Sequence, residues 1–135
     1  MGPRKHRFSF DECMSVMRSK NDPQAAEDGF HALLSRAAEH CVELVAEFRR
    51  ERNEGTRRWL LELIAAARSA DAMPVLAENL RVADESLRFF AIRGLRDLGT
   101  KEARRLLWEA RSFELESPSA TASLREQLDR LLGPP

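Results

Sequence analysis

The sequence predicts an all-helical protein built from stacked two-helix repeats, and three observations carry that prediction. Residues that cap helices recur along the chain, apolar residues recur at helical spacing, and the chain matches itself when it is shifted by 31 residues. No window shows sustained apolar alternation flanked by hairpin turns, so we expect no β-strand.

Capping residues mark where each helix begins. Ser9 and Glu12 match a capping box, in which each side chain accepts a hydrogen bond from the other's backbone. Asp22–Pro23 and Ser117–Pro118 place a cap before a proline at the first helical position, where the missing N–H costs nothing. The other expected boundaries are the caps Asn53, Asp71 and Asp84 and the C-terminal glycines Gly99 and Gly133.

The shift of 31 residues superposes caps, charges and apolar positions together. The superposed pairs include Asn53 with Asp84, Arg57 with Arg88, Ile64 with Leu95, Leu76 with Leu107, and Glu78 with Glu109. The expected first helices span residues 23–37, 54–68, 85–98 and 118–132, and the second helices span 40–51, 72–81 and 101–112. Such short helices are marginal alone, but three or more stacked pairs can bury a core. We therefore expect one repeat domain over residues 9–132, between a basic, frayed leader (1–8) and a tail (133–135).

The third unit has the most specific pattern. It reads DESLRFFAIRGL over residues 84–95, followed by Leu98-Gly99, Ala103 and Leu106-Leu107. This pattern resembles the bacterial HEAT repeats of the phycobilisome-lyase type, and the resemblance covers roughly residues 22–132. It implies a HEAT-like solenoid, a short α-α superhelix of about three and a half to four two-helix repeats. The second unit departs from the pattern, because Thr56 stands at the aliphatic place and Leu60 at the alanine.

The resemblance is less specific for function than for fold. HEAT proteins include scaffolds, chromophore-lyase subunits, toxin-neutralising partners and DNA-repair glycosylases. We expect a non-catalytic protein-binding module, such as a toxin-neutralising (immunity-type) partner or a regulatory adaptor. The alternatives are a nucleic-acid-binding protein related to the DNA-repair glycosylases and a chromophore-lyase-type subunit.

Composition narrows the classes of partner. Lys and Arg total 22 and Asp and Glu total 22, and a zero net charge argues against a general nucleic-acid binder. Cys13 and Cys41 are too few for a disulfide framework, so we expect both to be reduced. No stretch reaches the roughly 18 apolar residues of a membrane span. We therefore expect a soluble, cytoplasmic protein that binds another protein.

The sequence lacks the motifs of metal, phosphate and covalent chemistry. His31, His40 and Cys41 show none of the spacings typical of zinc sites. Neither a glycine-rich phosphate loop nor a nucleophile elbow is present. We expect no catalytic residue, no metal, no cofactor and no small-molecule substrate.

The expected binding surface is the side of the first helices that points away from their leucine faces. Each helical residue turns about 100°, so Phe89 lies opposite Leu87 and Leu95. The repeat register gathers the corresponding positions of all four first helices into one column on the concave side. These positions are Glu27, His31, Arg58, Glu62, Phe89, Arg93, Arg96, Glu126 and Asp129.

Several of these side chains have two interpretations. Phe89 is expected to be exposed, either as the anchor of an interface or as a single apolar residue on a solvated face. Trp59 and Phe90 either fill the contacts between neighbouring repeats or form a hot spot for binding. Arg57 and Arg88 are expected to bridge to a neighbouring Asp or Glu rather than to form a paired basic site.

Overall fold

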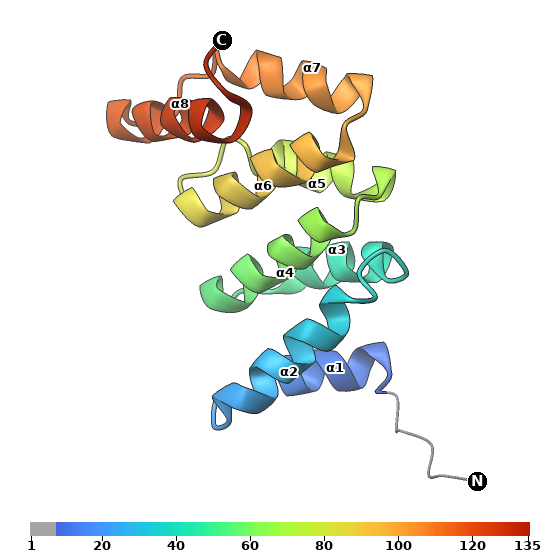
Figure 1. The fold of residues 1–135 in the computed structure, drawn as a ribbon. Helices are drawn as coiled ribbons and strands as arrows, with labels where there is room; N and C mark the ends of the chain where they lie inside the picture. The colour runs from blue at the N-terminus through green and yellow to red at the C-terminus, as the bar shows by residue number, and fades with distance from the viewer. Residues whose placement is uncertain (1–7) are drawn as a thin grey trace, which may run out of the picture. The chain divides into compact units, whose positions relative to one another are not determined.

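A computed structural model describes residues 8–135, and every regular element in this range is helical (Figure 1). The first elements are α1 (Phe10–Met17), α2 (Pro23–Leu34), α3 (Cys41–Arg50), α4 (Glu54–Ala66) and the 3-10 helix η1 (Ala70–Ala72). They are followed by α5 (Met73–Glu78), α6 (Glu85–Leu98), α7 (Lys101–Ala110) and α8 (Pro118–Leu132). The all-helical prediction is confirmed. The expected leader, apart from Phe8, lies outside the described residues.

The helices form two compact units, one ending at Arg36 and the other spanning Ala37–Pro135. In the N-terminal unit, α1 packs against α2. In the C-terminal unit, α4 packs against α3 and α6, while α6 also packs against α5, α7 and α8 (Figure 1). The α6 helix is therefore the centre of the C-terminal unit. That the two units form one domain over residues 9–132 stays a prediction.

Most of the expected caps are confirmed. Both hydrogen bonds of the capping box between Ser9 and Glu12 are present. The expected caps that accept from a backbone N–H three residues on are Asp22, Asn53, Asp84 and Ser117. Gly99 ends α6 in the left-handed conformation that glycine favours, at a φ of 68°.

The prediction that Asp71 caps a helix is wrong. The chain enters this segment through η1, which begins one residue before Asp71, and the Asp71 N–H donates to the hydroxyl of Ser69 at 3.2 Å. Helix α5 then begins at Met73 without a side-chain cap, and Pro74 lies in its first turn, where a proline needs no hydrogen bond. The second unit therefore departs locally from the 31-residue pattern.

The apolar equivalences of the repeat are confirmed. Ile64 and Leu95 are both fully buried, and so are Leu76 and Leu107, apart from a few per cent of their surface. Gly94 lets α6 approach its neighbours closely. A Cβ atom there would come within 2.9 Å of a Leu76 methyl and 3.0 Å of the Ala65 Cα. The core of the C-terminal unit therefore follows the register that the sequence predicts.

Arg88 is a buried cation, only 1% exposed, that joins α8 to the start of α6. Its guanidinium donates to the carbonyls of Val82 and Ala83 at 3.0 and 2.8 Å, just before α6. It also donates to the Gln127 amide oxygen at 3.0 Å and to the Ser123 hydroxyl at 2.7 Å, both on α8. Burial lowers the pKa of Arg88, which the charges of nearby carboxylates partly offset; arginine still stays protonated because its ordinary pKa is so high.

Arg57 makes the equivalent contact one repeat earlier. It donates to the carbonyl of Glu51 at 2.9 Å, as Arg88 does to that of Val82, and in both cases the acceptor lies six residues before the arginine. Arg57 also donates to the Phe48 carbonyl at 2.7 Å and lies 3.9 Å from the centre of the Phe48 ring. The prediction that both arginines bridge to a neighbouring carboxylate is therefore wrong. Carbonyls accept instead, because the end of the preceding helix and the linker after it leave carbonyl groups without helical partners.

Asp84 links two successive first helices of the C-terminal unit. One of its oxygens caps α6, accepting from the Leu87 N–H at 2.9 Å, and the other accepts from Arg58 of α4 at 2.7 Å. Partial burial alone would raise the pKa of the Asp84 carboxyl. The hydrogen bonds from Arg58 and the backbone, together with the Arg58 charge, outweigh burial and hold the pKa below its ordinary value of 3.8.

We predict that Asp84→Asn lowers stability at neutral pH and that the loss shrinks in acid. Asparagine still caps the helix, so the substitution removes mainly the charge that Arg58 contacts. Because the folded pKa is depressed, the carboxylate's contribution is full above 3.8 and is lost as the pH falls through the folded value. Urea denaturation of both proteins between pH 2 and 7 measures the difference. Asp22→Asn, which changes an exposed cap on α2, is the control; a difference constant with pH would contradict the prediction.

We predict that Arg88→Met lowers the free energy of unfolding by about 2–4 kcal/mol, because buried acceptors lose their donor. Arg88→Lys should recover only part of this, since a single ammonium cannot reproduce the planar fork of donors. Arg57→Met should cost less, because Arg57 is only half-buried. Urea denaturation followed by circular dichroism gives each value. The exposed Arg125→Met on α8 is the control; equal losses at positions 88 and 125 would rule out the structural role of Arg88.

Candidate binding site

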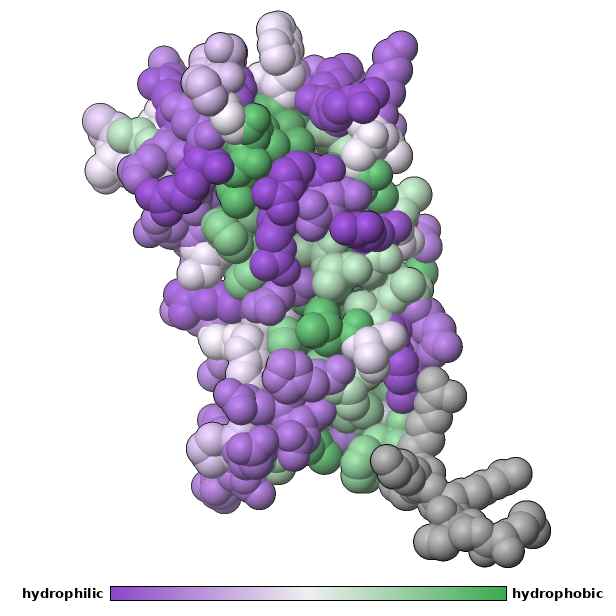
Figure 2. Space-filling view, viewed as in Figure 1, coloured by the Kyte–Doolittle hydropathy of each residue, from purple (hydrophilic) through white to green (hydrophobic). Residues whose placement is uncertain are grey.

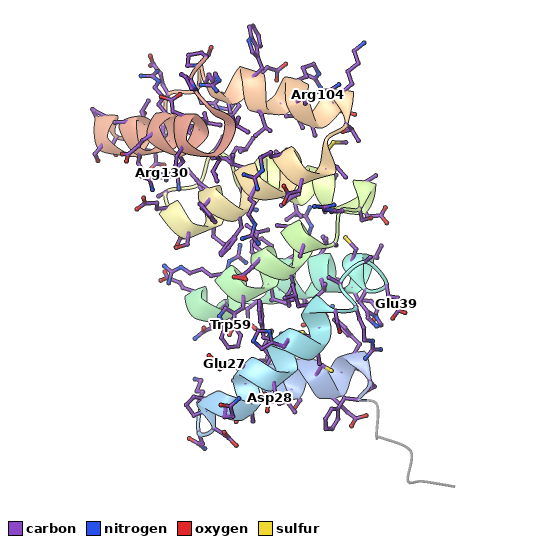
Figure 3. All side chains as sticks on the ribbon, in the orientation of Figure 1. Glu27, Asp28, Glu39, Trp59, Arg104 and Arg130 are labelled. Atoms are coloured by element: carbon purple, nitrogen blue, oxygen red, sulfur yellow. The ribbon has the colours of Figure 1, made fainter. Side chains whose placement is uncertain are left out.

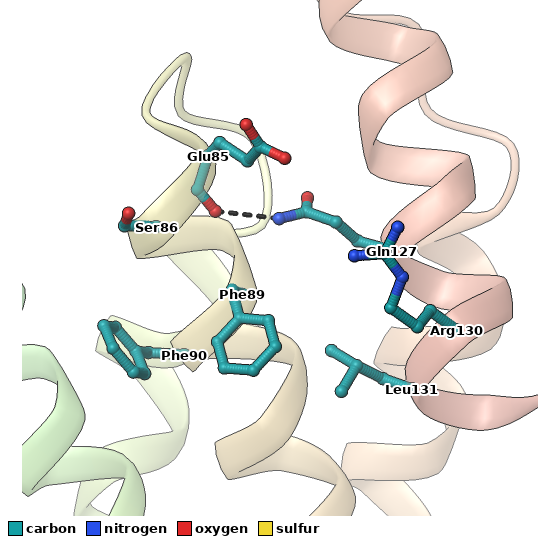
Figure 4. A pocket seen from close by; sticks show the side chains of 7 residues that line it. All are labelled: Glu85, Ser86, Phe89, Phe90, Gln127, Arg130 and Leu131. Carbon is teal, nitrogen blue, oxygen red and sulfur yellow. Dashed lines mark hydrogen bonds between the residues drawn. The ribbon is translucent and has the colours of Figure 1, made fainter.

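An open hollow of about 230 Å³ lies between α6 and α8 in the C-terminal unit. On the face seen in Figure 2, apolar surface shows between polar side chains over these two helices. Figure 3 labels Arg130, one of the lining residues, on the side of α8 that faces α6. The full lining comprises Glu85, Ser86, Phe89 and Phe90 of α6 and Gln127, Arg130 and Leu131 of α8 (Figure 4).

The apolar part of the hollow is made by two phenyl rings and a leucine. Phe89 and Phe90 meet edge to face, with ring centroids 5.5 Å apart, an arrangement that aromatic pairs prefer. Phe89 and Leu131 point toward each other from the facing helices (Figure 4). The hollow therefore offers apolar surface from both helices to a side chain that enters it.

Hydrogen bonds fix the two helices at both ends of the hollow. At one end Gln127, itself buried, donates to the Glu85 carbonyl at 2.8 Å while it accepts from Arg88 (Figure 4). At the other end Arg96 donates to the Leu131 carbonyl at 3.4 Å. The hollow is thus held open by contacts that need no ligand, as in most binding sites for small groups.

Arg93 lies beside the hollow, over both phenyl rings. Its guanidinium carbon is 5.4 Å from the centre of Phe90 and 5.9 Å from that of Phe89, within the range of cation–π attraction. The spacing follows from the helix, because these residues lie three and four positions before Arg93. Within residues 8–135 no carboxylate lies at ion-pair distance from Arg93. Arg93 is therefore a half-buried cation whose charge the described chain leaves unmatched.

Phe89 does not have the expected exposure. The structure places it half-buried in the hollow, because α8 packs against the side of α6 that carries it. The helical angles of α6 place Phe89 opposite the leucine face of that helix. They do not include the cover that α8, the following first helix, supplies. Phe90 and Trp59 are also half-buried, and Phe90 lines the hollow.

Most of the other expected site residues are paired within the chain. Arg58 binds Asp84, and Arg96 lies 3.1 Å from the Asp97 carboxylate. On α8 the pairs are Glu126 with Arg130 at 2.6 Å and Asp129 with Arg111 at 2.8 Å. Glu62 is half-buried on α4, and Glu27 and His31 are exposed on α2 of the N-terminal unit. Of the expected set, Phe89 and Arg93 are the residues that the structure brings together at the hollow; one continuous column stays a prediction.

Sequence analysis missed the contribution of α8 to the hollow. The register assigned Glu126 and Asp129 of α8 to the outward column and gave Gln127 and Arg130 no role. A signal was present: the last unit matches the third at a shift of 33 residues, which places Leu124 on Ala91 and Leu128 on Leu95. Gln127 then falls on Gly94, the position at which α6 approaches the preceding first helix.

The residues considered for metal binding are not among those that line the hollow. His40 lies 3.1 Å from the Glu43 carboxylate, and Cys13 and Cys41 are buried and free, with burial raising the pKa of both thiols. Over residues 8–135 no cluster of three or more His, Cys, Asp or Glu side chains could hold a metal ion. In the same range no helix is long and apolar enough to cross a membrane.

Comparisons with family models, with curated proteins and with solved structures find no match to this chain. What the site can do therefore follows from its own side chains: an apolar hollow held open between two helices, with an unmatched cation at its side.

Proposed function

We propose that the chain is a HEAT-like repeat protein that binds another protein without catalysing a reaction, and that the hollow between α6 and α8 is the centre of the interface. The partner inserts an apolar side chain between Phe89 and Leu131 and presents a carboxylate to Arg93. The observation that carries this proposal is Arg93, a cation stacked on two phenyl rings at an open hollow with no carboxylate of the described chain beside it.

The repeat architecture is supported by the order of contacts. Within the C-terminal unit α4 packs against α6, and α6 against α8, while α3, α5 and α7 alternate with them along the chain. The equivalent carbonyl contacts of Arg57 and Arg88 recur at the same spacing. Both features suit a solenoid, in which each repeat contacts mainly its neighbours.

The energetics favour Arg93 as the determinant of partner choice. Arginine and aromatic residues dominate the binding energy of protein interfaces, and a charge-assisted hydrogen bond strengthens where water is excluded. The rings beside Arg93 exclude water from one side of its guanidinium. Because hydrogen bonds already fix α6 and α8, the two helices lose little conformational entropy when a partner binds.

The charges around the hollow favour a protein over a nucleic acid. Glu85 lines the hollow, and Glu126 neutralises Arg130 at its edge. A continuous phosphate backbone would meet these carboxylates, and the chain carries no net positive charge to offset them. A protein segment with one carboxylate and one apolar side chain would not place a row of negative charges against these carboxylates.

We predict that random peptides of about 12 residues displayed on phage and selected on the protein will share an apolar residue next to Asp or Glu. Selection on Arg93→Glu should newly enrich an apolar residue next to Lys or Arg, because the charge beside the rings is inverted. Sequencing the selected peptides measures both preferences. Arg93→Glu should lower the free energy of unfolding by no more than about 1 kcal/mol, since only the contact with the rings is lost.

Two further variants make the test decisive. Arg52→Glu reverses an exposed charge in the linker before α4 and should select the same peptides as the wild type. Leu131→Ala enlarges the hollow and should weaken the apolar preference while it keeps the acidic one. Peptides with no shared charge, or the same peptides on Arg93→Glu as on the wild type, would contradict the proposal.

A further inference from the structure

Helix α7 carries a second surface that has no place in the hollow. Its buried residues are Ala103, Leu107 and Ala110. Trp108 is 73% exposed, more than the other large apolar side chains that are exposed in residues 8–135. The exposed residues that surround it are Lys101, Arg104, Arg105 and Ser112. Single exposed apolar residues are common, but tryptophan is the largest of them and here stands among cations.

The charges on this face are arranged in order around the helix. At about 100° per residue, Arg104, Trp108 and Lys101 fall within an arc of about 60°, with Trp108 in the middle. The acids of α7 lie on the far side of Arg105, which they neutralise: Glu109 is 2.6 Å and Glu102 3.6 Å from its guanidinium. The arc that holds Trp108 thus contains cations and no acid.

The two cations beside Trp108 are not matched by the described chain. Within residues 8–135 neither Lys101 nor Arg104, labelled on α7 in Figure 3, has a carboxylate at ion-pair distance, and Trp108 has no ring contact or hydrogen bond. The carboxylates of α7, Glu102 and Glu109, pair instead with the other arginine on this helix, Arg105. An exposed indole thus lies between two cations without carboxylate partners. This combination favours a ligand that carries both negative charge and an apolar part.

We propose that this face of α7, made by Lys101, Arg104 and Trp108, binds an acidic segment of a protein. An apolar side chain of the segment covers the Trp108 indole, and two carboxylates pair with Lys101 and Arg104. Tryptophan and arginine are the side chains that most often carry interface energy, and the segment's charge complements that of the face. None of these residues lines the hollow between α6 and α8, so the two proposals stand independently.

The border of the face selects a protein segment over a polyanion. Glu102 and Glu109 lie beyond Arg105, so a continuous run of phosphates that left the arc on that side would meet negative charge after one further cation. Two discrete carboxylates spaced for Arg104 and Lys101 would not. The zero net charge of the chain likewise gives no long-range attraction for a nucleic acid or an anionic membrane.

The test uses two fluorescein-labelled peptides of about 12 residues, one alternating Leu or Phe with Asp or Glu and the other with Lys replacing each acid. All proteins in this test carry Arg93→Gln, which removes the preference of the hollow for an acid without inverting it. In this background fluorescence anisotropy should show that the acidic peptide binds at least about tenfold more tightly than the basic one. Lys101→Glu with Arg104→Glu should reverse this order, and Trp108→Gln should weaken binding of the acidic peptide. Circular dichroism should show all variants folded, since these residues are exposed.

Controls separate this face from the hollow and from polyanion binding. Arg125→Glu, a charge reversal on exposed α8, should leave acidic-peptide binding unchanged in the same background. Loss of acidic-peptide binding on Arg93→Gln alone would place the site at the hollow and overturn this proposal. Equal binding of both peptides, an unchanged order in the double variant, or tighter binding of a thymidine oligonucleotide or of phosphatidylserine vesicles than of the acidic peptide would overturn it as well.

Discussion

The buried guanidinium of Arg88 is the constraint on which the C-terminal unit depends most. A cation that loses its water must be surrounded by acceptors, and within residues 8–135 no carboxylate accepts from this one. Its acceptors come from the linker before α6 and from two residues of α8, so satisfying one side chain fixes three segments at once. Gln127 extends this hydrogen-bond network, because its amide oxygen accepts from Arg88 while its amide nitrogen donates to the Glu85 carbonyl.

The hollow is a consequence of that constraint. Arg88 and Gln127 hold α8 at the start of α6, and Arg96 holds it again two turns further on. Between these points Phe89, Phe90 and Leu131 line a gap that they do not close. Arg93 can remain without a carboxylate because the faces of two phenyl rings, which carry negative charge density, replace part of its lost hydration.

What could be predicted from the sequence was local or periodic. Asn53 and Asp84 could be assigned as caps because a cap is decided within four residues, and Ile64 and Leu95 because the repeat brings them to equivalent places. The exposure of Phe89 was wrong because it depends on α8, more than thirty residues later. Arg88 was expected to bind a carboxylate because the sequence shows which neighbouring side chains are charged. It does not show which backbone carbonyls will be left to accept a hydrogen bond. The sequence did not single out Trp108, because a helical pattern does not distinguish a face with unpaired cations from an ordinary solvated face.

The recurrence of the Arg57 and Arg88 contacts bears on how such a chain can evolve. Each arginine donates to a carbonyl six residues before it, so the contact lies wholly inside one 31-residue segment that also contains its own cap. Duplicating or deleting a whole segment would carry this donor, this carbonyl and the cap together. An insertion between the carbonyl and the arginine would separate them. Selection on folding alone would therefore favour changes of length in whole segments, and the binding surfaces could diversify on a scaffold that grows by copying.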